Sequence, residues 1–163
     1  MEKVKLYLDF DGVILDTIDE SYRLMRLENI DIENQERIRE FYVKLNWEAF
    51  VNEIKEINNS MDAIQKLVNC NKYEVSVLTH VYTLEEAAAK INFIRSKIEN
   101  INVIPVPKII LKSKIVNPKN AILVDDYGYN VRDWIKNGGV GIKFVKKPEN
   151  GELRTIFSLE ELL

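Results

Sequence analysis

Asp9 and Asp11 are the first residues of the chain whose types and spacing could do chemistry. They end a short run of apolar and β-branched residues, and Gly12 follows them. Such a run that stops at carboxylates is typical of a buried parallel strand whose end reaches the rim of a sheet. Ligands of open α/β sheets bind at that rim. The glycine lets the backbone turn there and lets a substrate come close.

A second apolar run, residues 121–124, ends in the adjacent carboxylates of Asp125 and Asp126. If the two runs are neighbouring parallel strands, four carboxylates meet in one crevice. Carboxylates at such short range repel one another and require a cation. The pattern therefore predicts a site for a hard metal ion, most simply Mg²⁺.

Five segments that are expected to be strands alternate with helical segments. This alternation predicts a doubly wound α/β fold, in which right-handed connections place helices on both faces of a five-stranded parallel sheet. The expected strands are residues 3–9, 73–78, 101–106, 121–124 and 140–145, with prolines 105 and 107 breaking the third. Helices are expected to begin at capping side chains, namely Thr17, Ser60, Thr83, Asn130 and Ser158.

Residues 15–59 join the first strand to the next helix of the core without adding a strand. A connection of this length is too long for a compact α/β domain unless it has a structure of its own. Its sequence is helical, charged and aromatic. We therefore expect a small helical cap at 15–59, close to the carboxylates, inserted into an α/β core of residues 1–14 and 60–163.

Composition narrows the class of protein. The 163 residues carry a net charge of −3, which argues against a broad basic surface for duplex nucleic acid. A single cysteine excludes an internal disulfide, as is usual in a reducing compartment. The sequence has neither an apolar stretch of the roughly 18 residues needed to span a membrane nor a signal-peptide pattern. We expect a cytoplasmic protein that does not contact a membrane.

The order of these motifs resembles that of the haloacid dehalogenase superfamily, over nearly the whole chain. The family pattern is Asp-x-Asp-Gly after the first strand, a threonine after the second, then a lysine, then an acidic pair. Here these are Asp9-Phe10-Asp11-Gly12, Thr79, a lysine before the last acidic strand, and Asp125-Asp126. The resemblance implies a Rossmann-like sheet in the order 3-2-1-4-5 and a Mg²⁺-dependent phosphohydrolase.

The resemblance also implies roles for the four aspartates. Asp9 is the expected nucleophile, because a carboxylate can form an aspartyl-phosphate that water later hydrolyses. Asp11 is the expected general acid and base. The expected metal ligands are Asp9, the main-chain carbonyl of Asp11, and Asp125, while Asp126 binds the ion directly or through water.

Three further side chains are expected to bind the phosphoryl group. By resemblance Thr79 donates its hydroxyl to a phosphoryl oxygen, and neighbouring His80 shapes the loop or meets the substrate. The family lysine offsets negative charge on the nucleophile and the phosphate. Lys108, Lys112 and Lys114 all precede the last acidic strand, and the position of Lys114 favours it over the other two.

Residues 122–134 and 138–144 have a narrower likeness, to the branch that holds the 5′(3′)-deoxyribonucleotidases. This implies a small phosphorylated substrate, and a nucleoside monophosphate above others. A base could stack on aromatic side chains of the cap, although aromatics in a small helical insert usually form its own core. The candidates are Phe41, Tyr42, Trp47 and Phe50.

Three other readings stay open on the sequence. The chain could be a non-catalytic relative that binds a phosphorylated ligand. It could be a phosphatase that acts on a macromolecule, either a nucleic-acid 3′ end or a protein. A response-regulator receiver domain also combines acidic residues, a threonine and a lysine, but there the lysine comes last, whereas here it precedes the second acidic pair.

Overall fold

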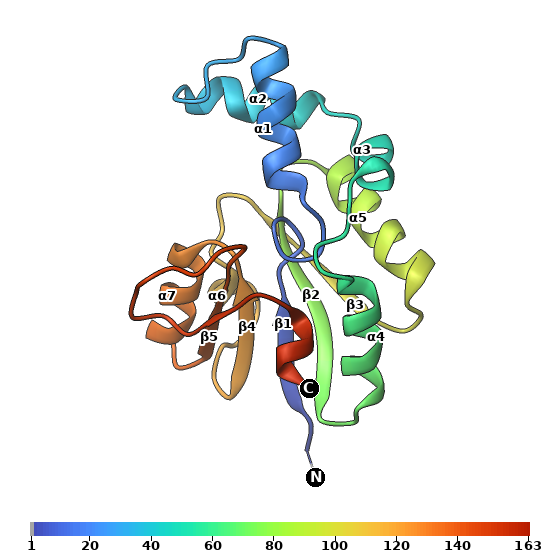
Figure 1. Ribbon diagram of the computed structural model, residues 1–163, viewed down its shortest axis with the longest axis vertical. Helices are drawn as coiled ribbons and strands as arrows, with labels where there is room; N and C mark the ends of the chain where they lie inside the picture. Colours follow the sequence, from blue (N-terminus) through green and yellow to red (C-terminus); the bar gives the residue numbers. More distant parts are fainter. Residues whose placement is uncertain (1) are drawn as a thin grey trace.

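A six-stranded parallel sheet in the order β3-β2-β1-β4-β5-β6 forms the centre of the computed structural model, which describes residues 2–163 (Figure 1). The strands are β1 (Val4–Leu8), β2 (Tyr73–Val81), β3 (Asn102–Pro107), β4 (Ala121–Asp125), β5 (Val140–Phe144) and β6 (Thr155–Ile156). The helices are α1 (Thr17–Leu27), α2 (Gln35–Lys44), α3 (Trp47–Glu53), α4 (Ser60–Asn69), α5 (Leu84–Lys97), α6 (Lys112–Ile115), α7 (Gly128–Lys136) and the 3₁₀ helix η1 (Leu159–Leu162).

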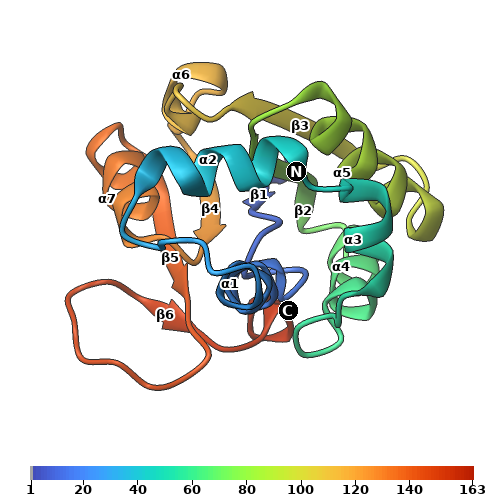
Figure 2. The same cartoon turned by 90° about the horizontal axis from the view of Figure 1, so that it is seen from above.

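Both faces of the sheet are covered, as the doubly wound prediction requires. Alternate residues of a strand point to opposite faces. Leu6 and Leu8 of β1 join a large apolar cluster with residues of α4, α5 and η1, whereas Tyr7 joins a second cluster with Trp134 of α7. Seen from above, α3, α4 and α5 lie on one side of the sheet and α6 and α7 on the other (Figure 2).

The predicted fold class is confirmed, but the sheet has six strands rather than five. The extra strand, β6, has two residues and pairs in parallel with β5. Two residues carry no periodicity, so the sequence gives no signal for it. Pro105 and Pro107 lie within β3 instead of breaking it. Because β3 is an edge strand, the missing proline amides leave the ladder to β2 intact.

Two of the five expected helix caps are found as predicted. Thr83 accepts a hydrogen bond from the Glu86 amide, and Ser158 forms a capping box with Glu161. Ser60 is instead the first residue of α4. Its hydroxyl donates to the carbonyl oxygen of Ile14, 46 residues away, which fastens α4 to the loop after β1.

Thr17 and Asn130 are the other two exceptions, and neither side chain caps its helix. Asp16 stands at the N-cap position of α1, and Asn130 lies within α7. Both side chains bind carboxylates near the ends of β1 and β4, as described below. Where a polar side chain has a buried carboxylate within reach, that charge-assisted hydrogen bond is stronger than a bond to a helix amide.

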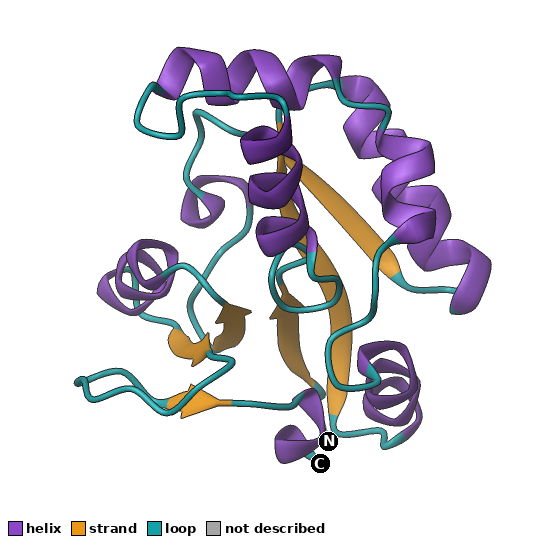
Figure 3. Ribbon diagram, turned by 45° about the horizontal axis from the view of Figure 1, so that its top comes forward, coloured by secondary structure: helices purple, strands orange, loops and turns teal. Residues whose placement is uncertain are grey.

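Helices α1 to α3 fill the segment that was predicted to be a cap, and α1 and α2 lie beyond the carboxyl ends of the strands (Figure 3). Met25, Ile38 and Phe41 form an apolar cluster of their own between α1 and α2. Trp47 and Phe50 of α3 instead belong to the apolar cluster of the sheet. The division at 14/15 and 59/60 therefore stays a prediction, and α3 packs as part of the core.

Strand register brings the predicted motifs to one edge of the sheet. Leu8 of β1 is aligned with Val77 of β2 on one side and with Val124 of β4 on the other. The residues that follow each of these positions therefore emerge together at the carboxyl edge. In the described part of the chain, no helix combines the length and apolar character needed to cross a bilayer.

Candidate active site

Asp9 follows β1 directly and is held by a buried lysine. Its amide donates to the carbonyl oxygen of Val124 at 2.9 Å, which continues the pairing of β1 with β4. Its carboxylate lies 2.8 Å from Nζ of Lys112, and the same Nζ lies 2.7 Å from Asp125 at the end of β4. All three side chains are buried. One ammonium therefore bridges the ends of two neighbouring strands.

Asp126 completes a compact group of carboxylates. One oxygen each from Asp9, Asp125 and Asp126 lies within 4.8 Å of the others. Burial, and next the charge of Asp125, raises the pKa of Asp9 to about 7. Burial, and next the charge of Asp9, raises the pKa of Asp126 to about 9. The Lys112 ammonium therefore neutralises the group only in part.

The donor set fits a divalent cation. Three convergent carboxylates supply the hard oxygen ligands that Mg²⁺ prefers. The raised pKa values of Asp9 and Asp126 reflect burial and mutual repulsion, which a bound cation would relieve. Gly12 makes room for this arrangement. Its φ is +75°, and a Cβ atom at this position would lie 2.3 Å from Oδ2 of Asp126. Any side chain at position 12 would displace that carboxylate.

Lys112, and not Lys114, is the lysine at the carboxylates, so the expectation for Lys114 is corrected. Both residues belong to the four-residue helix α6, and Lys114 is exposed. Two positions along a helix correspond to a rotation of about 200°, so the two side chains point in opposite directions. Lys108 lies in a different place again, on the wall of the cavity described below.

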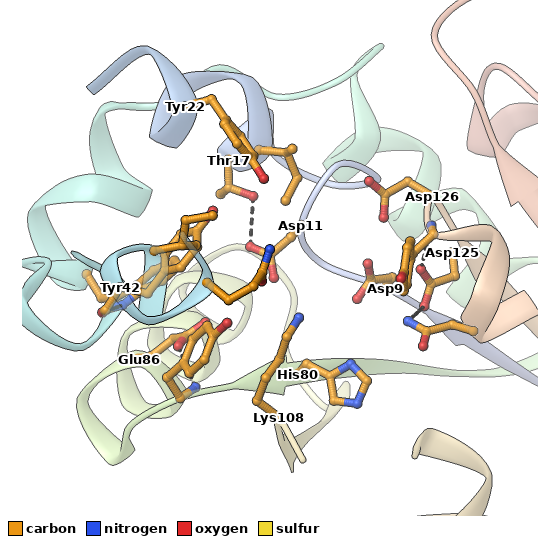
Figure 4. A pocket seen from close by; sticks show the side chains of 17 residues that line it. Asp9, Asp11, Thr17, Tyr22, Tyr42, His80, Glu86, Lys108, Asp125 and Asp126 are labelled. Atoms are coloured by element: carbon orange, nitrogen blue, oxygen red, sulfur yellow. Dashed lines mark hydrogen bonds between the residues drawn. The ribbon is translucent and has the colours of Figure 1, made fainter. Parts of the chain in front are cut away.

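Asp11 stands apart from the carboxylate group and has its own buried lysine. Oδ2 of Asp11 accepts a hydrogen bond from Lys90 at 2.7 Å, and Oδ1 accepts one from the Thr17 hydroxyl at 2.7 Å. Figure 4 shows that Thr17 and Asp11 face each other. Both lie across the cavity from the group of Asp9, Asp125 and Asp126. Although burial raises the pKa of Asp11, the charge and hydrogen bond of Lys90 outweigh it and lower that pKa.

Thr79 and His80 belong to the last three residues of β2 and do not follow the strand, because β2 continues to Val81. The Thr79 side chain is fully buried, and its hydroxyl contacts Lys90 at 3.2 Å. His80 lines the cavity, and its Nε2 donates to the carbonyl oxygen of Ile110 at 2.8 Å. Burial lowers the pKa of His80 to about 4, so its imidazole is neutral near pH 7.

A cavity of about 420 Å³ opens over the aspartates. Asp9, Asp125 and Asp126 lie at one end of it (Figure 4). Tyr42 lies at the opposite end, where it forms an aromatic wall with Trp47 and Tyr82. Tyr42 stacks on Tyr82 with ring centroids 5.5 Å apart and on Trp47 at 6.0 Å. Of the four candidate cap aromatics, Tyr42 and Trp47 line this cavity, whereas Phe41 and Phe50 are buried in apolar clusters.

Sequence reasoning missed three residues that contact the aspartates, namely Thr17, Lys90 and Asn130, and it missed Glu86, which contacts Lys90. The Asn130 amide donates to Asp125 at 3.0 Å, and Glu86 pairs with Lys90 at 2.7 Å. A glutamate four residues before a lysine is common on exposed helix faces. The neighbouring alanines at 87–89 are the one signal in the sequence that this pair is buried.

The comparisons with known proteins relate the chain to others through its fold. No protein-family model matches the sequence, and a comparison with curated proteins finds no similar sequence. Solved structures do match. A hydrolase from Pseudomonas syringae has a TM-score of 0.65 at 12% identity, and the match covers 98% of this chain and 96% of that one.

Two further matches have the same character. A haloacid dehalogenase-like hydrolase from Xanthomonas campestris has a TM-score of 0.63 at 10% identity, covering 98% of this chain and 93% of that one. The D,D-heptose 1,7-bisphosphate phosphatase from Burkholderia thailandensis has a TM-score of 0.56 at 14% identity, covering 98% and 96%. The parallel sheet, its strand order and the helices around it therefore form the fold of haloacid dehalogenase-like hydrolases.

Proposed function

We propose that the protein is a Mg²⁺-dependent phosphatase that hydrolyses a phosphate monoester through an aspartyl-phosphate on Asp9. The observation that carries this proposal is the grouping of Asp9, Asp125 and Asp126 around one point, with Lys112 bridging two of them. The fold supports it, because one structural neighbour is described as a phosphatase.

Asp9, Asp125 and Asp126 would hold the ion with their carboxylates, and Asp11 with its main-chain carbonyl. The bound ion supplies charge that draws the nucleophile and the phosphoryl oxygens together. Asp9 attacks the phosphorus atom, the bond from phosphorus to the ester oxygen breaks, and Asp11 as general acid gives the leaving oxygen a proton. Lys112 balances charge on the attacking carboxylate. Asp11 then accepts a proton from the water that hydrolyses the aspartyl-phosphate. His80 is neutral and stands at the cavity wall, where it can bind substrate.

A nucleoside monophosphate is the substrate that we propose. The cavity volume of about 420 Å³ lies within the range of roughly 300–1,000 Å³ that is typical of small-molecule sites. Phosphate at the aspartates would place the rest of the ester toward Tyr42 and Tyr82. A nucleobase can stack on such rings. The aromatic wall beside the aspartates favours a small substrate over a macromolecular one. The full set of acidic groups favours catalysis over ligand binding alone.

Asp9→Asn tests the nucleophile. The substitution keeps the shape of the side chain but removes its charge, so the Mg²⁺-dependent release of phosphate from 4-nitrophenyl phosphate should fall by a factor of about 10³ or more. Asp19→Asn is the matched control, because Asp19 is an exposed residue of α1 outside the cavity. Normal turnover by Asp9→Asn would contradict the proposed aspartyl-phosphate mechanism. Wild-type protein that hydrolyses none of a panel of phosphate esters would contradict the proposed phosphatase function.

A further inference from the structure

Lys90 is a fully buried cation that sits beside the carboxylate of Asp11. Its Nζ lies 2.7 Å from both Asp11 and Glu86, 3.2 Å from the Thr79 hydroxyl and 3.1 Å from the carbonyl oxygen of His80. Burying an ammonium is costly unless it is paired and hydrogen-bonded. Well-packed apolar residues often stabilise a protein as much as a buried ion pair does. Stability alone therefore gives little reason for a lysine here.

The contacts of Lys90 fix the orientation of Asp11. Lys90 donates to Oδ2, and the Thr17 hydroxyl donates to Oδ1. Both carboxyl oxygens of Asp11 therefore have a hydrogen-bond partner, and the two partners fix the direction of the side chain. Asp11 is thus held in one orientation from two elements, α5 and α1.

Lys90 also connects Asp11 to the aromatic wall. Its Nζ lies 4.8 Å from the centre of the Trp47 ring, and Trp47 stacks on Tyr42 at 6.0 Å. Trp47, Tyr42 and Asp11 all line the same cavity. The ammonium is therefore in contact with the base on one side and with the wall of the substrate cavity on the other.

We propose that Lys90 is a positioning residue that holds Asp11 as the base for hydrolysis of the aspartyl-phosphate. This inference rests on the proposed phosphatase function. In the step concerned, Asp11 takes a proton from water and the water oxygen bonds to phosphorus. The bond from phosphorus to the Asp9 oxygen breaks, its electron pair returns to the Asp9 carboxylate, and phosphate leaves. Lys90 keeps its protons throughout.

The test separates the two half-reactions. Lys90→Met is combined with Glu86→Gln, so that the buried carboxylate of Glu86 is not left without its cation. The glutamine still accepts the hydrogen bond that the Tyr82 amide gives to Glu86. With 4-nitrophenyl phosphate and Mg²⁺, kcat should fall by a factor of about 10² because water activation is lost. The ratio kcat/KM, which reports formation of the phosphoenzyme, should change less than threefold, so KM falls with kcat.

The phosphoenzyme itself provides a direct readout. The slower second step should make the double variant release a burst of nitrophenolate and carry a phosphate on Asp9 that mass spectrometry of the quenched protein detects. Glu86→Gln alone is the background against which the effect of the Lys90 substitution is measured. Lys97→Met is the matched control, because Lys97 lies on α5 and also stands over an aromatic ring, that of Phe93, but is exposed.

Equal losses in kcat and kcat/KM, or no loss in either, would overturn the role of Lys90, because damage to the fold slows both half-reactions. Thermal melting shows whether the double variant is folded at the assay temperature. If it is not folded, the combination of Lys90→Gln with Glu86→Gln replaces it. The losses in kcat and in kcat/KM are then compared in the same way, and the same results support or overturn the role of Lys90. Wild-type protein that releases no nitrophenolate would instead contradict the proposed phosphatase function.

Discussion

At the scale of single residues, two buried lysines divide the carboxylates into two sets. Lys112 pairs with Asp9 and Asp125, while Lys90 pairs with Asp11. Two aspartates only two positions apart therefore have opposite electrostatic environments. The pKa of Asp9 is raised by burial and by the charge of Asp125, and the pKa of Asp11 is lowered by Lys90 despite its burial. This separation suits a nucleophile and a base with different tasks.

Lys112→Met and Lys114→Met form a matched pair of variants on one short helix. Lys112→Met leaves Asp9 and Asp125 buried without their cation, so the free energy of unfolding without metal should fall by about 3–5 kcal/mol. Its kcat/KM should fall about 10²-fold, as when a preorganised charge is removed. Lys114 is exposed, and its variant should match wild type in urea titration and in turnover. A reversed result would restore Lys114 as the site lysine.

At the scale of elements, the aromatic side of the cavity lies where helices of the predicted cap meet the end of β2. Tyr42 comes from α2 and Trp47 from α3, and Tyr82 directly follows β2. Because Tyr42 stacks on both other rings, the aromatic wall joins segments far apart in the sequence. The position of α2 relative to the sheet therefore decides how much room a substrate has.

Tyr82→Leu tests whether this wall binds a base. Loss of a stacking partner weakens binding of one base by about 1–3 kcal/mol, so KM for a nucleoside monophosphate should rise about fivefold or more. Hydrolysis of glycerol phosphate, which has no ring to stack, should keep its KM. The control is Tyr129→Leu, which alters an exposed tyrosine outside the cavity. If Tyr82→Leu leaves the KM for a nucleoside monophosphate unchanged, the nucleotidase proposal is contradicted and the phosphatase proposal is not affected.

At the scale of the whole molecule, the clustering of Asp9, Asp125 and Asp126 opposes folding when no metal is bound. The pKa values of Asp9 and Asp126 rise from 3.8 to about 7 and about 9. The folded protein therefore holds protons that the unfolded chain has already released. Stability without metal is greatest where both groups are protonated and is lost as pH rises from about 4 to about 9.

Magnesium should reverse this loss, because it binds deprotonated carboxylates of the folded chain. We expect the gain in Tm with Mg²⁺ to be larger at about pH 8.5 than at about pH 5.5, as measured by calorimetry with chelator as reference. Asp125→Asn should abolish most of the gain at both pH values. A gain that is independent of pH, or that Asp125→Asn retains, would contradict the assignment of the metal site.

Much of the fold and part of the site could be predicted from local pattern. Each central strand is a short apolar run with a polar end, so the strands, their parallel direction and the meeting of Asp9 with Asp125 follow from periodicity. Thr83 and Ser158 cap helices as their spacing predicts. β6 was missed because a two-residue strand has no pattern, and Thr17 was misread because its partner is a carboxylate and not a helix amide.

By itself the sequence determined where the acidic groups emerge, because the largely buried apolar runs at residues 6–8 and 121–124 stop directly before Asp9 and Asp125. Only the tertiary structure decided which cations meet them. Lys112 and Lys114 are alike in sequence, and a helical rotation separates them. Glu86 and Lys90 have a spacing that is common on exposed helix faces, and only the packing of α5 brings Lys90 to Asp11. Long-range packing sets these pairings, and no local spacing encodes it.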